Sequence, residues 1–247
     1  MRAEAKALID AAEVVTVLSG AGISTDSGIP DFRGPNGLWT KDPDAEKASN
    51  IDYYVRDAEI RRKNWARRAE GALWADVEPN AGHHALVRLQ DRGKLHTLIT
   101  QNVDELHQRA GIDQHHMVEI HGTTRKAQCL SCSWRDDIEV VLDRVRNGEP
   151  DPPCEVCGGL LKSATISFGQ QLVAEDLERA EIASKACDVF LAVGSSLSVY
   201  PIAQAVPIAV HHGADLIIVN AEPTPFDDQA TVVLHESLSE TLPAILS

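Results

Sequence analysis

Residues 14–22 read VVTVLSGAG and place a short apolar run directly before a glycine-rich loop. The run is rich in β-branched side chains, which is typical of a strand buried in a parallel sheet. Comparable runs occur at 95–100, 116–120, 189–193, 216–219 and, more briefly, 232–234. Apolar residues at helical spacing lie at 2–12, 83–92, 174–185, 202–211 and 238–246. This alternation predicts an α/β fold in which helices cover both faces of a parallel sheet.

The composition is that of an ordinary globular protein. The 247 residues are 43% apolar and carry a formal net charge of −14. That charge argues against a protein that coats nucleic acid or an anionic membrane, so we expect neither partner. Residues 189–210 are uncharged and long enough to span a bilayer, but their Gly, Pro and Ser residues favour a strand, a turn and a buried helix. Because the N-terminus lacks the apolar segment of a secretory signal, we expect a cytoplasmic protein.

Four of the five cysteines form two Cys-x-x-Cys pairs, Cys129/Cys132 and Cys154/Cys157, with 21 residues between the pairs. Two such pairs can place four thiolates tetrahedrally around one Zn²⁺. Four thiolates leave no open coordination position, so the pattern predicts a structural zinc ion rather than a catalytic one. Redox-active pairs or buried free thiols are the alternative interpretation. The fifth cysteine, Cys187, is predicted to be a small buried residue.

Small or polar residues follow the apolar runs where each run ends. The loop after the first run carries Gly20, Gly22 and Gly28, a spacing that differs from the G-x-G-x-x-G of dehydrogenases. The other ends are Thr100–Asp104, His121–Gly122, Gly194–Ser196 and Asn220–Glu222. Ligands of open α/β sheets bind at the carboxyl ends of the strands, so these residues predict one site that a dinucleotide would fill. The sequence contains neither a Walker motif nor a G-x-S-x-G elbow, which argues against a P-loop ATPase and a serine hydrolase.

Taken in order, these motifs resemble those of the sirtuin family of NAD-dependent protein lysine deacylases, with a bacterial-type catalytic core. The resemblance covers the chain from about residue 6 onward and rests on Gly20–Ser24, Gly28–Arg33, Thr100–Asp104, His121–Gly122, both Cys-x-x-Cys pairs, Gly194–Ser196 and Val219–Asn220. It implies a Rossmann-like NAD-binding domain and a small inserted zinc-binding domain, with both ligands in the cleft between them. We assign 1–31, 77–122 and 163–247 to the Rossmann-like domain, 32–76 to the cofactor loop and helical part of the small domain, and 123–162 to its zinc ribbon.

The resemblance also implies roles for individual residues. The pyrophosphate and nicotinamide end of NAD would contact Gly20, Ala21, Gly22, Asp31, Phe32 and Arg33. The nicotinamide ribose would contact Gln101 and Asn102, and the nicotinamide amide would contact Asp104 and the Val103 backbone. The phosphates and the adenosine ribose would contact Gly194, Ser195, Ser196, Asn220 and Glu222. The acyl-lysine peptide would pair with Ile166, Ser167, Phe168 and Gly169.

The implied reaction consumes NAD as a co-substrate. The acyl oxygen of lysine would attack C1′ of the nicotinamide ribose, so that nicotinamide leaves, with Asn102 among the catalytic residues. The 2′-hydroxyl would then attack the resulting imidate, which requires a base near neutral pH. Histidine, with an ordinary pKa of about 6.5, suits that task, and the resemblance places His121 there. The products would be free lysine, nicotinamide and O-acyl-ADP-ribose.

Two departures from the family pattern concern the substrate. Ser163 and Gln170 stand where many sirtuins carry Pro and Glu. Sirtuins that remove acidic acyl groups use a Tyr-x-x-Arg pair, but here Trp65 takes the place of Tyr beside the retained Arg68. We therefore predict deacetylation, or removal of neutral acyl groups. Desuccinylation or demalonylation, mono-ADP-ribosylation in the same cleft and a non-catalytic zinc-ribbon interaction module are the alternatives.

Overall fold

The computed structural model describes residues 1–31, 37, 40, 49–71 and 76–247. Two compact units divide the chain. The large unit comprises Met1–Asp31, Glu78–Ile120 and Leu172–Ser247, and the small unit comprises Phe32–Val77 and His121–Gln171. Residues 163–171, which we assigned to the Rossmann-like domain from the sequence, group with the small unit, where a strand that ends at Thr165 pairs with the strand that begins at Gly122.

The large unit is built on a six-stranded parallel sheet in the order β3-β2-β1-β7-β8-β9. Its strands are β1 (Val15–Ser19), β2 (Leu95–Thr100), β3 (Met117–Glu119), β7 (Val189–Val193), β8 (Asp215–Val219) and β9 (Val232–Leu234). The chain proceeds outward from β1 to β3 and then returns to the other side of β1 as β7. The topological switch point, where such sheets bind ligands, therefore lies between β1 and β7. The predicted α/β fold is confirmed.

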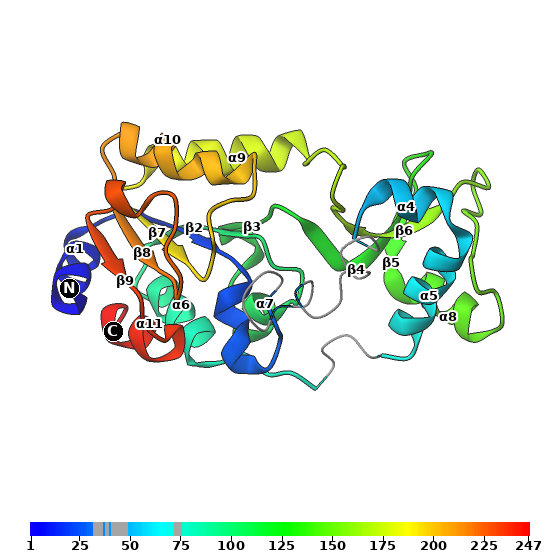
Figure 1. Cartoon of the computed structure of the whole chain (residues 1–247), viewed down its shortest axis with the longest axis horizontal. Helices are drawn as coiled ribbons and strands as arrows, with labels where there is room; N and C mark the ends of the chain where they lie inside the picture. Colours follow the sequence, from blue (N-terminus) through cyan, green and yellow to red (C-terminus); the bar gives the residue numbers. More distant parts are fainter. Residues whose placement is uncertain (32–36, 38–39, 41–48, 72–75) are drawn as a thin grey trace. The chain divides into compact units, whose positions relative to one another are not determined.

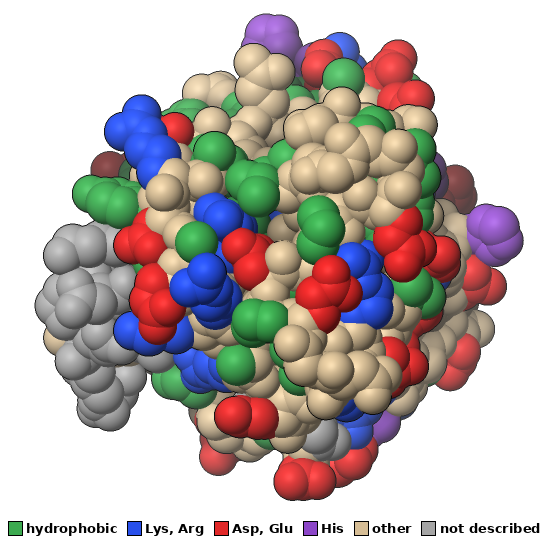
Figure 2. All heavy atoms as spheres, turned by 90° about the vertical axis from the view of Figure 1, so that its right-hand side faces the viewer, with side chains coloured by type: hydrophobic (Ala, Val, Ile, Leu, Met, Phe, Trp, Pro, Cys, Tyr) green, Lys and Arg blue, Asp and Glu red, His purple; other side chains and the backbone are tan. Residues whose placement is uncertain are grey.

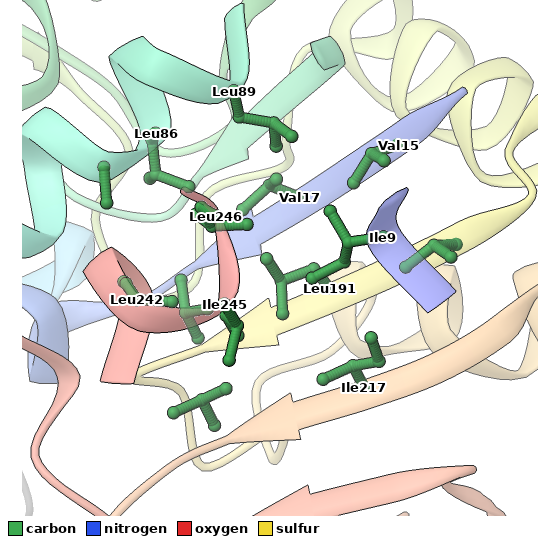
Figure 3. Packing of buried hydrophobic residues seen from close by; sticks show 14 of the residues in the cluster. Ile9, Val15, Val17, Leu86, Leu89, Leu191, Ile217, Leu242, Ile245 and Leu246 are labelled. Carbon is green, nitrogen blue, oxygen red and sulfur yellow. The ribbon is translucent and has the colours of Figure 1, made fainter. Parts of the chain in front are cut away.

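Helices cover both faces of this sheet, so its central strands β1 and β7 are fully buried (Figure 1). One face packs against α1 (Arg2–Ala11), α6 (Ala81–Asp91) and α11 (Leu238–Ile245). Figure 3 shows this core, with Val15 and Val17 of β1 facing residues of those three helices. Leu18 points to the opposite face, as successive residues of a strand do. There it joins the core formed with α9 (Ala174–Ala186), η3 (Ile202–Gln204) and α10 (Ala205–His211).

The uncharged stretch 189–210 contains β7, a turn, η3 and most of α10. Within the described parts of the chain, no helix combines the length and apolar character that a membrane crossing requires. The interpretation of this stretch as strand, turn and helix is therefore confirmed, whereas the cytoplasmic location stays a prediction. Four short helices complete the large unit: η1 (Ala21–Ser27), α7 (Leu106–Ala110), η2 (Gln114–His116) and η4 (Asp227–Gln229).

Among its described residues, the small unit combines the helices α4, α5 and α8 with an antiparallel sheet in the order β5-β4-β6. Its elements are α4 (Ile51–Arg56), α5 (Ala58–Ala69), β4 (Gly122–Cys129), β5 (Arg135–Asp137), α8 (Ile138–Arg146) and β6 (Leu161–Thr165). Its core gathers Trp65 of α5, Val141 of α8 and Leu161 of β6 around two of the cysteines. The cysteine-bearing segment thus contributes to a packed core.

Helix α8 lies within residues 123–162, which we assigned to the zinc ribbon from the sequence without predicting a helix there. Its apolar residues Ile138, Val141, Leu142 and Val145 follow the spacing of an amphipathic helix and face the core of the small unit. Asp137 caps its N-terminus by accepting a hydrogen bond from the Glu139 backbone at 3.1 Å. Both signals are present in the sequence, so this helix was predictable.

Charged side chains of both signs mix on the surface of the small unit. Figure 2 shows the side that lies at the right in Figure 1, where acidic and basic side chains are interspersed. Arg146 pairs with Glu139 and Asp143, as expected for a solvated helix face. Arg61 differs, because it is 8% exposed and its guanidinium contacts both carboxylate oxygens of Asp151 at 2.9 to 3.1 Å. This buried, paired arginine is therefore part of the packed fold of the small unit.

Candidate functional site

The glycine-rich loop after β1 packs main chain to main chain against the loop after β7. Gly20 N donates to Val193 O at 3.0 Å, and Gly22 N donates to Gly194 O at 2.8 Å. A Cβ at Gly22 would lie 2.7 Å from Gly194 Cα. Gly194 has φ +59°, and a Cβ there would lie 2.4 Å from the Ile23 nitrogen. The switch point therefore has no room for side chains at these positions.

The loop after β2 is tied to the same glycine-rich loop by buried polar side chains. Asn102 Nδ2 donates to Gly20 O at 3.1 Å and lies 3.3 Å from Ser24 Oγ. Ser24 Oγ donates to Asp104 Oδ2 at 2.7 Å, and Leu106 N donates to Asp104 Oδ1 at 3.0 Å. Burial raises the pKa of the Asp104 carboxyl, while the hydrogen bonds from Ser24 and Leu106 act in the opposite direction. The sequence motif thus becomes one hydrogen-bonded cluster with Asn102 and Asp104 held in fixed positions.

The ends of β7 and β8 add a second group of polar residues. Gln101 Nε2 donates to Ser195 Oγ at 2.8 Å, which joins the end of β2 to the end of β7. Asn220 follows β8, is 9% exposed and donates from Nδ2 to the Glu222 carbonyl at 2.7 Å. Ser196 and the side chain of Glu222 are exposed. The polar residues predicted at the strand ends of the large unit therefore follow β1, β2, β7 and β8, which are neighbours in the sheet.

Five of the predicted NAD contacts need separate mention. Asp31 is half-buried and ends the first described segment. Phe32 and Arg33 lie outside the described residues. Ala21 opens η1, and Val103 is half-buried between Asn102 and Asp104.

His121 begins the second segment of the small unit and lies beside the predicted substrate segment. Its carbonyl accepts a hydrogen bond from Ile166 N at 2.7 Å. The following Gly122 has φ +75°, and a Cβ there would lie 2.1 Å from the Ala164 carbonyl oxygen. The close approach of β4 to β6 therefore requires glycine after the histidine and fixes the backbone of His121.

The predicted substrate segment 166–169 follows β6 rather than extending it. Phe168 N donates to Ser49 O at 2.9 Å, and Ile51 N donates to Phe168 O at 3.0 Å, so this residue already pairs with the chain near α4. Ser167 N donates to Gln170 Oε1 at 2.8 Å. Gln170 thus closes a local turn, and the Phe168 side chain remains 41% exposed.

The four cysteines of the two Cys-x-x-Cys pairs meet in the small unit. Their Sγ atoms all lie within 4.8 Å of one another. Cys129 and Cys157 Sγ are 3.5 Å apart, and Cys132 and Cys154 Sγ are 3.8 Å apart. Tetrahedral Zn–S bonds of about 2.3 Å place sulfur atoms about 3.8 Å apart, so the cluster has the right size for one Zn²⁺. Cys187 is buried in the large unit and is not one of this group.

Comparison with known proteins places this arrangement in a family. The family model described as Sir2 matches residues 20–201. The chain belongs to the Sir2 family. The NAD-dependent protein deacetylase 2 of Streptomyces coelicolor is 51% identical to this sirtuin over 233 residues, with 94% of this chain and 96% of that protein covered. The NAD-dependent protein deacetylase 1 of Bradyrhizobium diazoefficiens is 42% identical, with 95% and 91% covered.

Solved Sir2 structures share the fold of this sirtuin over its whole length. One contains a deacetylated p53 peptide and 3′-O-acetyl-ADP-ribose and aligns with a TM-score of 0.87 at 33% identity, covering 99% of this chain and 96% of that one. Another contains a p53 peptide and NAD⁺ and aligns with a TM-score of 0.86 at 32% identity, covering 100% and 97%. The resemblance that the motifs indicated is therefore confirmed.

The sirtuin places Trp65 and Arg68, the pair considered for acyl recognition, in different surroundings. Trp65 is fully buried in the core beside Ala127 and Leu161, and its Nε1 has no hydrogen-bond partner within the described chain. Arg68 is half-buried, and its Nε donates to Asn64 Oδ1 at 2.9 Å. Trp65 therefore contributes to the core of the small unit.

A further cation, Lys162, lies near Arg68 and was not singled out from the sequence as a site residue. It is 3% exposed, and its Nζ donates to Thr165 O at 2.6 Å and to Ser163 O at 3.3 Å. Burial, followed by the charge of Arg68, lowers the pKa of Lys162 to about 7. Ser24 was also missing from the candidate residues, although its place two residues after Gly22 in the glycine-rich loop could have suggested it.

Proposed function

We propose that this sirtuin removes acyl groups from protein lysine side chains in a reaction that consumes NAD, with acetyl as its main acyl group. The observation that carries the proposal is the buried cluster of Ser24, Asn102 and Asp104 against the glycine-rich loop. It offers an amide and a carboxylate, fixed in advance, at the ligand-binding edge of the sheet. Such fixed polar groups stabilise a developing charge without reorganisation during the reaction.

The residues of the large unit fit the parts of NAD. The main-chain contact of Gly20 and Gly22 with Gly194 leaves a surface without side chains, onto which a pyrophosphate can approach closely. Asn102 would face the nicotinamide ribose, and Asp104 would accept a hydrogen bond from the nicotinamide amide. Ser195 and Asn220 would contact the phosphates and the adenosine ribose. When bound, NAD supplies the ADP-ribosyl group that receives the acyl group.

His121 would act as the general base that takes the proton from the ribose 2′-hydroxyl. An imidazole suits this step because its ordinary pKa lies near neutral pH. The hydrogen bond between Ile166 N and the His121 carbonyl holds the base next to the segment proposed to bind the peptide. The four-cysteine cluster would hold one structural Zn²⁺, which supplies cohesion to the small unit and takes no part in the chemistry.

Acetyl is proposed because Trp65 offers no hydroxyl for an acidic acyl group and is buried in the core. Removal of acidic acyl groups is the second candidate. A specific observation favours it: Arg68 has another cation, Lys162, as its neighbour, and such a pair would be stabilised by a carboxylate. The two candidates differ in whether the Arg68 guanidinium meets the acyl group.

The test compares an acetyl-lysine peptide with its succinyl counterpart, each incubated with NAD and followed by mass spectrometry. We expect faster acetyl loss, with nicotinamide and O-acetyl-ADP-ribose as products and no turnover by H121A. The R68M variant should retain acetyl removal, and R67M, altered at an exposed neighbouring position, is its control. Faster succinyl loss that R68M alone abolishes would establish the second candidate. NAD consumption with both peptides unchanged would instead support ADP-ribosyl transfer to another nucleophile.

A further inference from the structure

A buried histidine in α7 is connected to the backbone of Asn102 through two hydroxyl groups. His107 is 1% exposed, and its Nε2 lies 2.9 Å from Ser19 Oγ. Ser19 Oγ donates to Thr100 Oγ1 at 3.0 Å. Asn102 N also donates to Thr100 Oγ1, at 3.1 Å. The chain of contacts runs from the helix, across the ends of β1 and β2, to the residue that the proposed function places at the nicotinamide ribose.

We propose that His107 is a positioning residue for the NAD reaction, which acts through Ser19 and Thr100 to hold Asn102 in place. This inference rests on the proposed function, because that function gives Asn102 its role. All four residues are at least nine-tenths buried, so water does not replace a lost link easily. A backbone shift of a fraction of an ångström at Asn102 would misalign its amide with the ribose.

The direction of the hydrogen bonds follows from a second histidine. Asn80 N donates to His83 Nδ1 at 3.3 Å, so the proton of the neutral His83 ring lies on Nε2. The rings of His83 and His107 have centroids 5.0 Å apart and are tilted by 57° to each other. Within the described chain, His83 Nε2 and His107 Nδ1 are both buried without a partner. A proton on His107 Nδ1 would add a second buried N–H without an acceptor, which is costly, so we assign the bare nitrogen of His107 to Nδ1.

His107 therefore carries its proton on Nε2 and donates it to Ser19 Oγ. Ser19 is then free to donate its own proton to Thr100 Oγ1, as the geometry of that contact requires. Burial, with a smaller contribution from His83, keeps the pKa of His107 well below its ordinary value, so the ring is neutral. The chain of hydrogen bonds therefore requires one tautomer of His107. In it His107 orients the Ser19 hydroxyl, Ser19 orients the Thr100 hydroxyl, and Thr100 holds the Asn102 amide.

Paired substitutions separate the hydrogen bond from the volume of the ring. The amide of Gln in H107Q reaches the position of Nε2 and can still bond Ser19, whereas the shorter Asn in H107N reaches only the position of Nδ1. T100V removes the acceptor of the Asn102 amide and keeps the shape of the side chain. I99V is the matched control, because it removes a buried methyl group from the adjacent residue of β2 without touching the chain of contacts.

Steady-state kinetics with an acetyl-lysine peptide, calorimetry with ADP-ribose and thermal unfolding are measured for each variant. We expect H107N and T100V to lower kcat by about tenfold or more. We expect ADP-ribose affinity to change by less than about twofold, because the phosphate and adenosine contacts lie at other strand ends. H107Q should recover most of the lost rate, and the H107N/T100V double variant should be no slower than the slower single one. Rates that fall only in proportion to thermal stability, as in I99V, would overturn the inference, as would H107Q as slow as H107N.

Amide hydrogen exchange at Asn102 provides a readout that needs no turnover. Protection of this amide should fall in H107N and T100V and return in H107Q. Unchanged protection of the Asn102 amide in H107N would overturn the inference, whatever the activity of that variant. The wild-type protein could leave NAD and acyl-lysine intact while H107N and T100V still show the expected loss of protection. That result would overturn the proposed function and leave the positioning of Asn102 by His107 supported.

Discussion

Ser24 donates a 2.7 Å hydrogen bond from its hydroxyl to Asp104 Oδ2, and neither side chain is more than 8% exposed. A buried carboxylate depends on such donors, because its charge is otherwise costly to desolvate. The Asp104 carboxylate thus joins the two loops, because it accepts hydrogen bonds from Ser24 in the glycine-rich loop and from Leu106 after β2.

Replacing Ser24 by Ala should destabilise the protein and impair NAD use. Loss of a hydrogen bond to a buried charged group costs roughly 1–3 kcal/mol, and the pKa of Asp104 should rise further. Urea denaturation measures the loss of stability, and KM for NAD measures the impaired use of NAD. S196A removes an exposed hydroxyl after β7 and should leave both unchanged. Equal stability of S24A and S196A would contradict the importance of this contact.

Gly194→Ala should be far more damaging than alanine at another glycine of positive φ. At Gly194 the new Cβ would lie 2.4 Å from the Ile23 nitrogen, whereas at Gly213, with φ +94°, it would meet nothing within 4 Å. G213A therefore measures only the backbone strain, about 1–2 kcal/mol. We expect thermal unfolding to show a much larger loss for G194A, together with loss of ADP-ribose binding in calorimetry. Similar melting temperatures for the two variants would show that the main-chain contact adjusts at little cost.

Removal of zinc should unfold the small unit. We expect one zinc ion per chain by elemental analysis, released by a strong chelator with loss of the helical signal and of activity. Structural zinc sites contribute about 10–16 kcal/mol of apparent binding energy, which this small core cannot replace. C154S should behave like the chelated protein, and C187S, altered in the large unit, should keep its zinc. Zinc content unchanged in C154S would rule out the four-cysteine site.

Acid should destabilise the large unit through its buried histidines. Burial, followed by the charge of His84, lowers the pKa of His83 to about 4, and that of His107 is also well below 6.5. Between about pH 6.5 and pH 4 these histidines bind protons in the unfolded chain but stay neutral in the folded protein. Its free energy of unfolding therefore falls as the pH drops through this window, by ~1.4 kcal/mol per pH unit for each such ring.

Urea denaturation at pH 6.5, 5.5 and 4.5, on the wild type and on H83F, measures this dependence. H83F should be less sensitive to acid, because one of the two rings that must charge on unfolding is gone. H212F, altered at an exposed histidine, should follow the wild type. Parallel pH profiles for H83F and the wild type would show that His83 takes up its proton in the folded state.

The sequence predicted the large unit well because its strands are buried on both faces. Such strands are uninterrupted apolar runs, and each of the five long runs is a strand of the parallel sheet. The small unit was harder to predict, since β4 and β5 are partly exposed and do not form apolar runs. The amphipathic pattern of α8 was present but was overlooked among the turn residues around the cysteines.

The candidate site divides in the same way. Asn102 and Asp104 belong to a compact motif, so a resemblance could locate them. The contact of His107 with Ser19 joins residues 88 positions apart, and only the packing of α7 against the ends of β1 and β2 brings them together. Nor could the spacing of Trp65 and Arg68 reveal that the tryptophan is enclosed in a core.

The β4–β6 ladder connects the metal to the proposed catalytic base by purely mechanical means. It runs from the pairing of Cys129 with Leu161, across a register shift between Ala127 and Gly122, to the pairing of Gly122 with Thr165, directly beside His121. A zinc ion held by the four cysteines would lie at the other end of this ladder and would influence the base only by keeping the ladder assembled. Its electronic character is then irrelevant to turnover. Cobalt or cadmium, which accept the same tetrahedral thiolate geometry, should sustain the rate as well as zinc.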